Sequence, residues 1–325
     1  MLAWASDLVA RLLTWADALQ RRYGVLGFPY AVVKKYGDDA GGRQAALITY
    51  YGFLGMFPLT LLAASVLARV LADNPSLRDR LIHEVVPPEL QHTVENALHA
   101  MPSSGVPFAV GLVGLLFAGT GVVFSAYETL NHLAGVPMRS RFGFISRYAR
   151  VLLVLVVVLA GALGVAVLTV ASGALPDVSG LQRLAAAVGA AVVVFVVLEV
   201  AAKLLVARPV RLRACWPAAV LGAVTVAAVL AIGTRLLATL VTKSGLVYGS
   251  FATVVGIFAL LYLVSQALLY AAEVAVVRHG RLWPRALDTS RPTAADVRAL
   301  TRLATEQERL ASERIEIGFI AAGGE

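Results

Sequence analysis

The chain has 325 residues, of which 59% are hydrophobic and only 15% are charged. This composition excludes an ordinary soluble domain, in which about 25% of residues are charged, and it predicts an all-α integral membrane protein. The formal net charge of +8 could reflect nucleic-acid binding. However, Lys and Arg collect on the cytoplasmic side of membrane proteins, so we expect no nucleic-acid partner.

Residues 1–44 are predicted to form amphipathic helices at the cytoplasmic membrane surface. Within residues 2–22, apolar side chains recur at helical spacing, at Leu8, Leu12, Trp15 and Leu19. A second short helix over residues 28–36 leads into a turn at residues 37–39. Charged residues interrupt the region, and no hydrophobic stretch is followed by a cleavage site, so we predict no signal peptide.

The first predicted span, residues 45–71, carries no charge before Arg69. Tyr50 and Tyr51 lie where this helix enters the membrane. Pro58 removes a hydrogen bond near its middle, so we expect a hinge there and a neighbouring helix that satisfies the free carbonyl. These features predict a bundle of several helices and argue against a single membrane anchor.

Six apolar segments are long enough to cross a bilayer, for which about 20 residues suffice. They cover residues 45–71, 108–130, 148–171, 184–206, 216–240 and 250–277, within a transmembrane domain of residues 45–280. The loops that precede the third and fifth spans are basic. The first outer loop, residues 73–107, is acidic on balance, so both termini are predicted to be cytoplasmic.

Two segments outside the spans also show helical spacing. The outer loop over residues 73–107 is broken by prolines and is predicted to hold two short amphipathic helices. The cytoplasmic tail over residues 281–325 has mixed charges and a helical pattern over residues 294–317, which predicts a solvated helix with a frayed end.

Ionisable groups inside spans cost at least about 2.5–3.5 kcal/mol each on insertion scales, so each suggests a specific role. Glu199 and Lys203 are four residues apart on one helix face, where they can pair. Tyr262 begins a stripe that continues along the last span at steps of four, four and three residues. The candidate binding residues are Tyr50, Tyr51, Glu128, Arg150, Glu199, Lys203, Gln266, Tyr270 and Glu273.

The depth of these residues allows two interpretations. In the predicted topology, groups from four helices lie in the cytoplasmic third of the membrane, at Tyr50, Tyr51, Glu128, Glu199, Lys203 and Glu273. They could line a water-filled vestibule that binds a polar or charged group. Alternatively, they snorkel to the inner interface, or pair to lock the bundle.

Three blocks of the chain resemble the YihY/BrkB family. They are AALITYYGFLGMFPLTLL from Ala45, SAYETLNHLAGV from Ser125 and YGSFATVVGIFALLYLVSQALLYAAEVAVV from Tyr248. The blocks follow the family's order and extend over residues 40–280. Glu273 matches the acid near the end of the last span, although the small and amide residues that usually flank it are replaced.

The resemblance implies a bacterial inner-membrane protein with six spans, linked broadly to envelope integrity. An older label for members is ribonuclease BN, but a metal-dependent nuclease needs clustered ligands. His83, His92 and His99 lie in the predicted outer loop, so we expect no ribonuclease activity, no bound metal and no other cofactor. A zinc site at those three histidines is a less favoured alternative.

Together these features predict a transporter or flippase for an anionic amphipathic lipid or envelope solute, with membrane lipids as partners. Lys203, with Arg150 or Arg147, would neutralise a phosphate, and the acids would carry protons. No GxxxxGK[ST] loop is present, so energy would come from an ion gradient or from none. A non-transporting membrane scaffold is the alternative, and an intramembrane lipid-modifying enzyme is less favoured. The oligomeric state stays open.

Overall fold

The computed structural model describes residues 14–74, 105–173, 180–209, 212–243, 245–288 and 291–319. Most of the predicted outer loop, including its three histidines, lies outside these residues, as do residues 1–13 and 320–325. The chain separates into two units, one made of Met1–Thr49 and Val123–Glu325 and the other of Tyr50–Val122.

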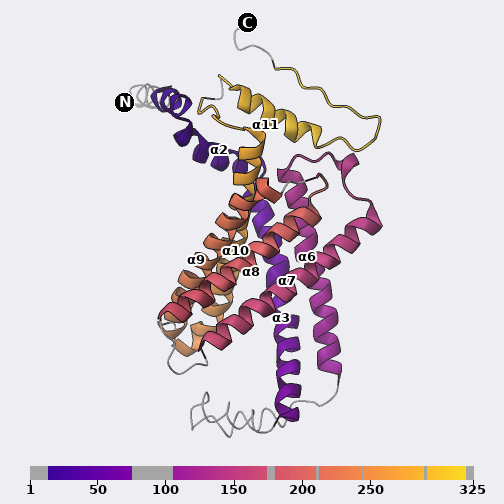
Figure 1. Ribbon diagram of the computed structural model, residues 1–325, viewed down its shortest axis with the longest axis vertical. Coiled ribbons are helices and arrows are strands. Elements are labelled where there is room, and N and C mark those ends of the chain that lie inside the picture. The colour runs from indigo at the N-terminus through magenta and orange to yellow at the C-terminus, as the bar shows by residue number, and fades with distance from the viewer. Residues whose placement is uncertain are drawn as a thin grey trace. The chain divides into compact units, whose positions relative to one another are not determined.

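The described part of the chain is helical and contains no strand. Its elements are α2 (Gly24–Asp38), α3 (Gly41–Asp73), α6 (Val106–Leu133), the 3-10 helix η1 (Met138–Ser140), α7 (Phe144–Gly173), α8 (Gly180–Leu205), α9 (Leu212–Lys243), α10 (Gly245–Gly280) and α11 (Ala294–Thr305), labelled in Figure 1. The all-α prediction is therefore confirmed for the described residues.

Five described helices are long and apolar enough to cross a membrane. The apolar segments are Gly41–Val66, Val106–Leu133, Phe144–Thr169, Gly180–Leu205 and Thr253–Gly280. Exposed apolar side chains along them, such as Leu153, Val156 and Val196, suit a lipid environment. In α9 the described apolar stretch is only Cys215–Leu230, so the span at residues 216–240 stays a prediction, as does the orientation of the termini.

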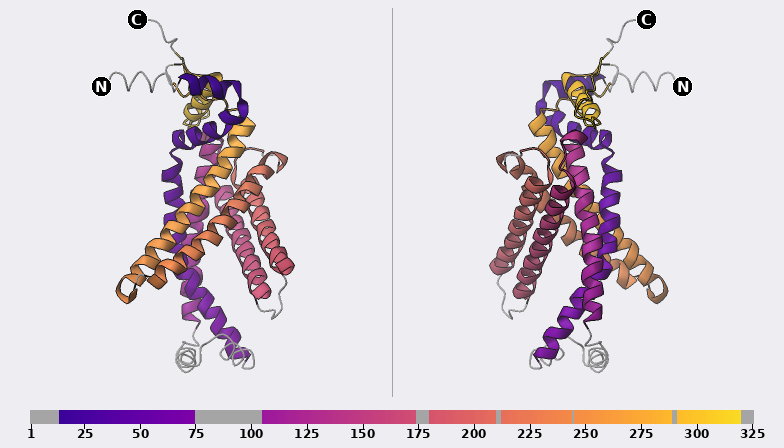
Figure 2. Two further views of the ribbon diagram at one scale, coloured as in Figure 1. Left: turned by 90° about the vertical axis from the view of Figure 1, so that its left-hand side faces the viewer. Right: turned by 90° about the vertical axis from the view of Figure 1, so that its right-hand side faces the viewer.

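In the first unit, sequential helices form two pairs. α7 packs against α8 and α9 against α10, while α8 also contacts α9. Figure 2 shows these pairs as two hairpins that diverge from the end where α2 and α11 lie. α2 packs against α10. Residues far apart in sequence are therefore gathered at one end of this unit.

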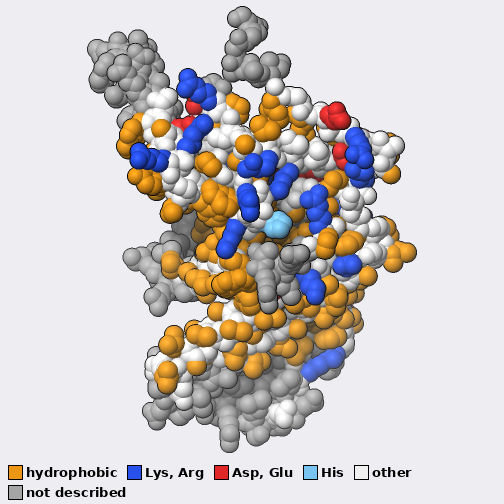
Figure 3. All heavy atoms as spheres, turned by 45° about the horizontal axis from the view of Figure 1, so that its top comes forward, with side chains coloured by type: hydrophobic (Ala, Val, Ile, Leu, Met, Phe, Trp, Pro, Cys, Tyr) orange, Lys and Arg blue, Asp and Glu red, His pale blue; other side chains and the backbone are white. Residues whose placement is uncertain are grey.

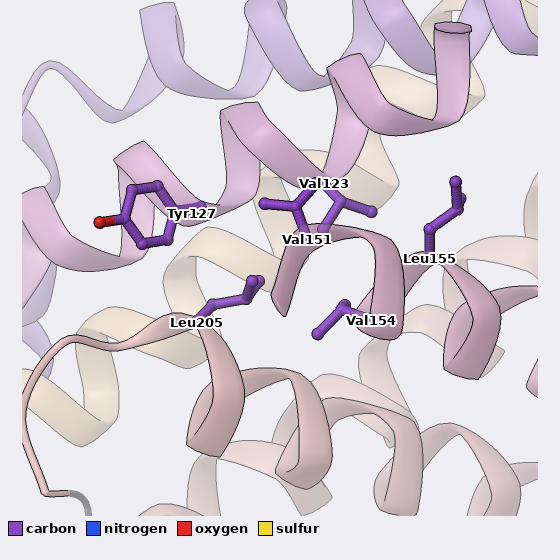
Figure 4. Close-up of a cluster of buried hydrophobic side chains, with 6 residues drawn as sticks. All are labelled: Val123, Tyr127, Val151, Val154, Leu155 and Leu205. Carbon is purple, nitrogen blue, oxygen red and sulfur yellow. The ribbon is translucent and has the colours of Figure 1, made fainter. Parts of the chain in front are cut away.

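Two apolar clusters hold this end of the first unit together. Val123 and Tyr127 of α6 pack with Val151, Val154 and Leu155 of α7 and with Leu205 of α8, as Figure 4 shows. The other cluster joins α2, α10 and α11, and consists of Ala31, Val32, Val277, Leu282 and Ala299. Because these side chains pack closely between the helices, the clusters fix the helix ends that carry the charged residues.

The second unit contains the rest of α3 and α6, which approach closely through glycines. A Cβ added at Gly114 would lie 2.8 Å from the Cβ of Pro58, and one at Gly111 would lie 3.0 Å from the backbone N of Leu62. Pro58 lies inside the continuous helix α3. Gly111 and Gly114 therefore allow α3 and α6 to pack closely, and hinge motion at Pro58 stays a prediction.

The helix predicted to begin at residue 294 is confirmed at its start, but its length, even with a frayed end, and its solvated character are wrong. α11 ends at Thr305, and the chain from there to Phe319 is not helical. The backbone of Glu306 and Glu308 instead accepts hydrogen bonds from Met138 and Arg139, at 3.0 and 2.9 Å. The side chains of Glu306 and Glu308 are buried. Tertiary hydrogen bonds have thus replaced helical ones, and the tail is docked.

Candidate functional site

The predicted polar stripe of α10 faces α2. The ring of Tyr36 stacks on that of Tyr270, with centroids 4.2 Å apart, and the Tyr36 hydroxyl lies near Gln266. Lys35, one residue earlier, reaches Glu273, with Nζ 3.8 Å from Oε2. The stripe therefore forms a shared face, as the spacing predicts, but this face contacts another helix.

Lys35, Asp39 and Glu273 form a cluster of ionisable side chains that is almost completely buried. Their exposed fractions are 5%, 1% and 0%. Lys35 forms an ion pair with Asp39 and also donates a hydrogen bond to the backbone oxygen of Leu133 at 3.4 Å. We call these three residues the buried triad. The triad links α2 and α10 to the end of α6.

A second group of charges joins α6 and the loop after it to the tail. Nδ1 of His132 lies 2.7 Å from Glu306, and Arg141 donates to Glu306 at 2.6 Å. Arg141 also pairs with Glu128, and Arg147 lies 3.7 Å from the Glu128 carboxylate. Glu128, predicted to bind substrate, is thus held by two arginines in this structure.

A third group of charges ties the two ends of the chain together. Arg285 forms ion pairs with Asp296 at 2.6 Å and Asp38 at 2.8 Å. Lys34 lies 3.0 Å from Asp296, and the backbone N–H of Leu287 donates to Asp17 at 2.9 Å. The N-terminal helices are therefore docked on the segment after α10.

Asp296 is the centre of this third group. Burial opposes its ionisation, but hydrogen bonds from Arg285, from the backbone of Ala286 and Thr293 and from the Thr293 hydroxyl lower the pKa of Asp296 well below its usual range. Although burial acts against the charged guanidinium, Asp296 and Asp38 raise the pKa of Arg285. Thr293 and Asp296 also form a capping box at the start of α11.

Asn131 and Arg150 hold the end of α8. The buried Asn131 amide donates to the backbone oxygen of Leu205 at 2.9 Å, and its oxygen accepts from the N–H of Ala207 at 2.8 Å. Arg150 donates to the Leu204 oxygen at 3.3 Å and lies over the ring of Phe142. Arg150, predicted to bind substrate, therefore caps helix carbonyls that would otherwise be free.

Glu199 and Lys203 do not pair, contrary to the expectation from their spacing. Glu199 is 9% exposed, and neither of its carboxylate oxygens has a hydrogen-bond partner among the described residues. Lys203 is exposed to the surroundings of the helix. The two side chains lie in different environments, since Glu199 is buried in a helix that packs against α9 and Lys203 is exposed.

Tyr50 and Tyr51 belong to the second unit. Their rings form an edge contact with centroids 5.2 Å apart, and Tyr50 is 52% exposed. Tyr51 packs against Gly121, where an added Cβ would lie 2.4 Å from its ring. Tyr51 is therefore a packing residue between α3 and α6, and Tyr50 presents its ring outward.

The described surface around α2 and α11 is strongly basic. Figure 3 shows many Lys and Arg side chains there and few acids. Gly135 follows the end of α6 and has a positive φ of +59°. A Cβ added there would lie 3.3 Å from the Cβ of Arg302. The guanidinium of Arg302 packs against Gly280 at the end of α10. Burial lowers the pKa of Arg302, and the neighbouring Arg208 and Arg298 lower it further. The face thus contains arginines that repel one another.

A small cavity lies between the buried triad and this basic face. It has a volume of about 10 Å³, and its lining includes Lys35, Asp39, His132 and Arg302. Such a volume has room for about one water. The described residues contain no group of three His, Cys, Asp or Glu that could hold a metal ion.

Several residues of these groups were not predicted from the sequence, although some of them have a local signal. Lys35 and Asp39 are four residues apart, a spacing that indicates pairing on a helix. Thr293 followed three residues later by Asp296 indicates a capping box. Arg285 and Glu306 lie in irregular segments, where no periodic pattern identifies a buried charge.

Comparisons with known proteins agree with the resemblance. The model of the family described as Virulence factor BrkB matches residues 32–296. Inner membrane protein YhjD of Escherichia coli (strain K12) is 28% identical over 117 residues, which are 35% of this chain and 34% of that protein. An uncharacterized protein of Dickeya dadantii (strain 3937) is 33% identical over 88 residues, 26% of each chain. No solved structure matches.

The matched segments span only 34% and 26% of the length of these two curated relatives. The family match is much longer. It begins in α2 and ends in α11, so it includes the five described apolar helices and the buried charges that join α2 to α10 and α11. The chain therefore belongs to the BrkB family and is a multi-pass membrane protein.

Proposed function

We propose that the protein is a transporter or flippase in the bacterial inner membrane that moves an anionic amphipathic lipid or envelope solute. Both termini would face the cytoplasm, because positive charge collects on that side. The basic surface around α2 and α11 would then meet the headgroup of the cargo before it enters the membrane domain.

The observation that carries this proposal is the carboxylate of Glu199. It lies in an apolar helix, is nine-tenths buried and has no hydrogen-bond partner among the described residues. A buried polar group without a partner costs about 1–3 kcal/mol, and more when it is charged. Ionisable groups in spans mark ion or substrate pathways, so Glu199 fits a role that only a bound ligand or ion completes.

The basic face supports an anionic cargo. Arg208, Arg298 and Arg302 lie close enough that the first two lower the pKa of the third, which burial already depresses. A phosphate or carboxylate bound between them would relieve this repulsion and form charge-assisted hydrogen bonds. Lys203, exposed near the end of α8, adds a further cation that a headgroup could reach.

The scaffold alternative rests on the docked tail and N-terminal helices, which present an ordered surface to partner proteins. A scaffold needs the buried ion pairs for stability but has no use for an unpaired Glu199. An intramembrane enzyme is the least supported alternative, because the three groups of charges and Glu199 do not bring a nucleophile and a base together.

The charge-neutral variant Glu199→Gln separates transport from packing. Purified protein is reconstituted in vesicles that contain headgroup-labelled phosphatidylglycerol, and movement between leaflets is followed by quenching from outside. Wild type should accelerate movement, and Glu199→Gln should abolish the acceleration while its thermal unfolding is unchanged. The exposed pair Arg314→Ala and Glu316→Gln serves as the control. A wild-type rate no higher than that of protein-free vesicles favours the scaffold, and equal acceleration by wild type and Glu199→Gln excludes Glu199 from the transport site.

A further inference from the structure

The buried triad contains one cation and two carboxylates. Lys35 can neutralise only one of Asp39 and Glu273, and Asp38 is already paired with Arg285 at 2.8 Å. Burying an uncompensated charge is so costly that a buried group neutralises instead. The triad is therefore one positive charge short.

The position of that missing charge follows from the contacts of Glu273. It is completely buried, and neither of its oxygens accepts a hydrogen bond from a described residue. The Asp39 carboxylate lies at the same ammonium group, because Lys35 pairs with Asp39 and its Nζ is 3.8 Å from Oε2 of Glu273. Two adjacent carboxylates share one proton, because they cannot both be ionised at short range. A proton between Glu273 and Asp39 supplies both the charge and the missing hydrogen bond.

His132 connects this position to the surface of the protein. Its Nδ1 lies 2.7 Å from the Glu306 carboxylate and its Nε2 lies 3.2 Å from the backbone oxygen of Asp39. With Glu306 ionised, both partners are acceptors, and an imidazolium, in which both ring nitrogens donate, fits these two contacts. The His132 side chain is 20% exposed, and it also lines the cavity beside Lys35 and Asp39.

We propose that Glu273 and Asp39 form a proton-binding site and that His132 is its route to the basic face. This inference rests on the proposed transport function and names its coupling ion as H⁺. The groups that face the site from neighbouring elements are Lys35, Asp38, Arg302 and Glu306. Their charges set the pH at which the proton leaves.

The transfer balances with one proton and no electrons. The carboxyl O–H bond breaks, and through the one-water cavity an N–H bond forms at Nε2 of a neutral His132. The resulting imidazolium can donate from both ring nitrogens to the two contacts described above. Its Nδ1–H bond then breaks as an O–H bond forms on the Glu306 carboxylate, and that O–H bond breaks in turn when a water accepts the proton.

Infrared spectroscopy of the full chain in lipid nanodiscs tests the site directly. A protonated carboxyl gives a C=O band that a carboxylate lacks and that shifts in D₂O. Glu199 is also buried without a partner among the described residues and can give such a band of its own, so the test is made in Glu199→Gln protein. We expect the band in Glu199→Gln, and we expect it to be lost in the double variant Glu199→Gln, Glu273→Gln. The double variant Glu199→Gln, Glu128→Gln is the matched control, because Glu128 is paired with arginines outside the triad. A band that survives in Glu199→Gln, Glu273→Gln overturns the proposal.

Two further measurements do not depend on the folding of Glu273→Gln. In the Glu199→Gln chain labelled with ¹³C at glutamate side-chain carboxyls, the band must move, and an unmoved band overturns the assignment. In His132→Gln, deuteration of the band should slow by about 100-fold, the scale of a lost proton-transfer group; unchanged deuteration overturns the role of His132.

Failure of this inference and failure of transport give different results. If transport in vesicles does not depend on a pH gradient, the transport proposal stands and H⁺ is not its coupling ion. If Glu273 carries a proton but the protein transports nothing, the proton site stands and the transport proposal is wrong.

Discussion

Arg285 and Asp296 form an ion pair of 2.6 Å that is almost fully buried, between the segment after α10 and the first turn of α11. Asp38 of α2 binds the same guanidinium. One arginine therefore fastens the N-terminal helices and the tail to the end of the last span.

The variant Asp296→Asn should destabilise this region by about 3 kcal/mol, because it leaves the buried Arg285 without its best partner. The measurement is limited proteolysis of the tail together with thermal unfolding in detergent. The exposed Glu316→Gln is the control and should behave as wild type. Equal protease resistance in Asp296→Asn and wild type would show that the ion pair does not hold the tail.

The same ion pair predicts the direction of the pH dependence. The pKa of Asp296 is lower in the folded protein than in the unfolded chain, where it is about 3.9. Its contribution is therefore fully present above that value and is lost as the pH falls below it. Tail cleavage by an acid-active protease should stay constant from pH 7 to about pH 5 and rise below about pH 4 in wild type. In Asp296→Asn this rise should be smaller.

Asn131 should be essential for the end of α8. Replacing it with Ala removes the partners of the Leu205 oxygen and the Ala207 N–H, each worth about 1–3 kcal/mol when buried and left unsatisfied. We expect a loss of about 2–4 kcal/mol in the free energy of unfolding. Asn131→Asp keeps the acceptor for Ala207, but it buries a carboxylate against the backbone oxygens of Tyr127 and Leu205 and should lose at least as much. If both variants unfold like wild type, the cap is dispensable.

The two helices of the second unit offer a matched pair of glycines. Gly114→Ala places a Cβ 2.8 Å from that of Pro58 and should cost about 1–3 kcal/mol by overpacking. Gly52→Ala meets nothing within 4 Å and should stabilise α3 by up to about 1 kcal/mol. Thermal unfolding of both variants checks this difference, and equal effects would contradict the close helix contact.

The orientation can be measured with single cysteines in a Cys215→Ala chain. Asn74→Cys, at the end of α3, should react with a membrane-impermeant maleimide in intact cells. Gly143→Cys, before α7 and with nothing within 4 Å of its Cβ position, should react only after the membrane is opened. The reverse pattern would mean that the termini face outward.

Hydrophobic length was enough to predict the five helices found as candidate spans, since a run of about 20 apolar residues is a local property. The α10 stripe was also predictable from spacing alone. Its partner was not, because the contact of Tyr36 and Lys35 with α10 joins residues more than 200 positions apart. Glu199 and Lys203 show a second limit of prediction from sequence, since a spacing of four residues allows a contact but does not ensure one.

The end of the tail helix was predicted too far along the sequence, because the contacts that end it are tertiary. Helical spacing continues in the sequence past Thr305. In the structure α11 ends there, and the Glu306 carboxylate contacts His132 and Arg141. Long-range ion pairs of this kind leave no periodic pattern in the sequence.

Native mass spectrometry of protein purified gently from its own membranes tests the transport proposal most directly. We predict one defined anionic lipid or solute bound to wild type and lost in the double variant Glu199→Gln, Lys203→Ala, but kept in Arg314→Ala, Glu316→Gln. A broad distribution of bulk phospholipids that is the same in all three proteins would contradict a cargo site and favour the scaffold.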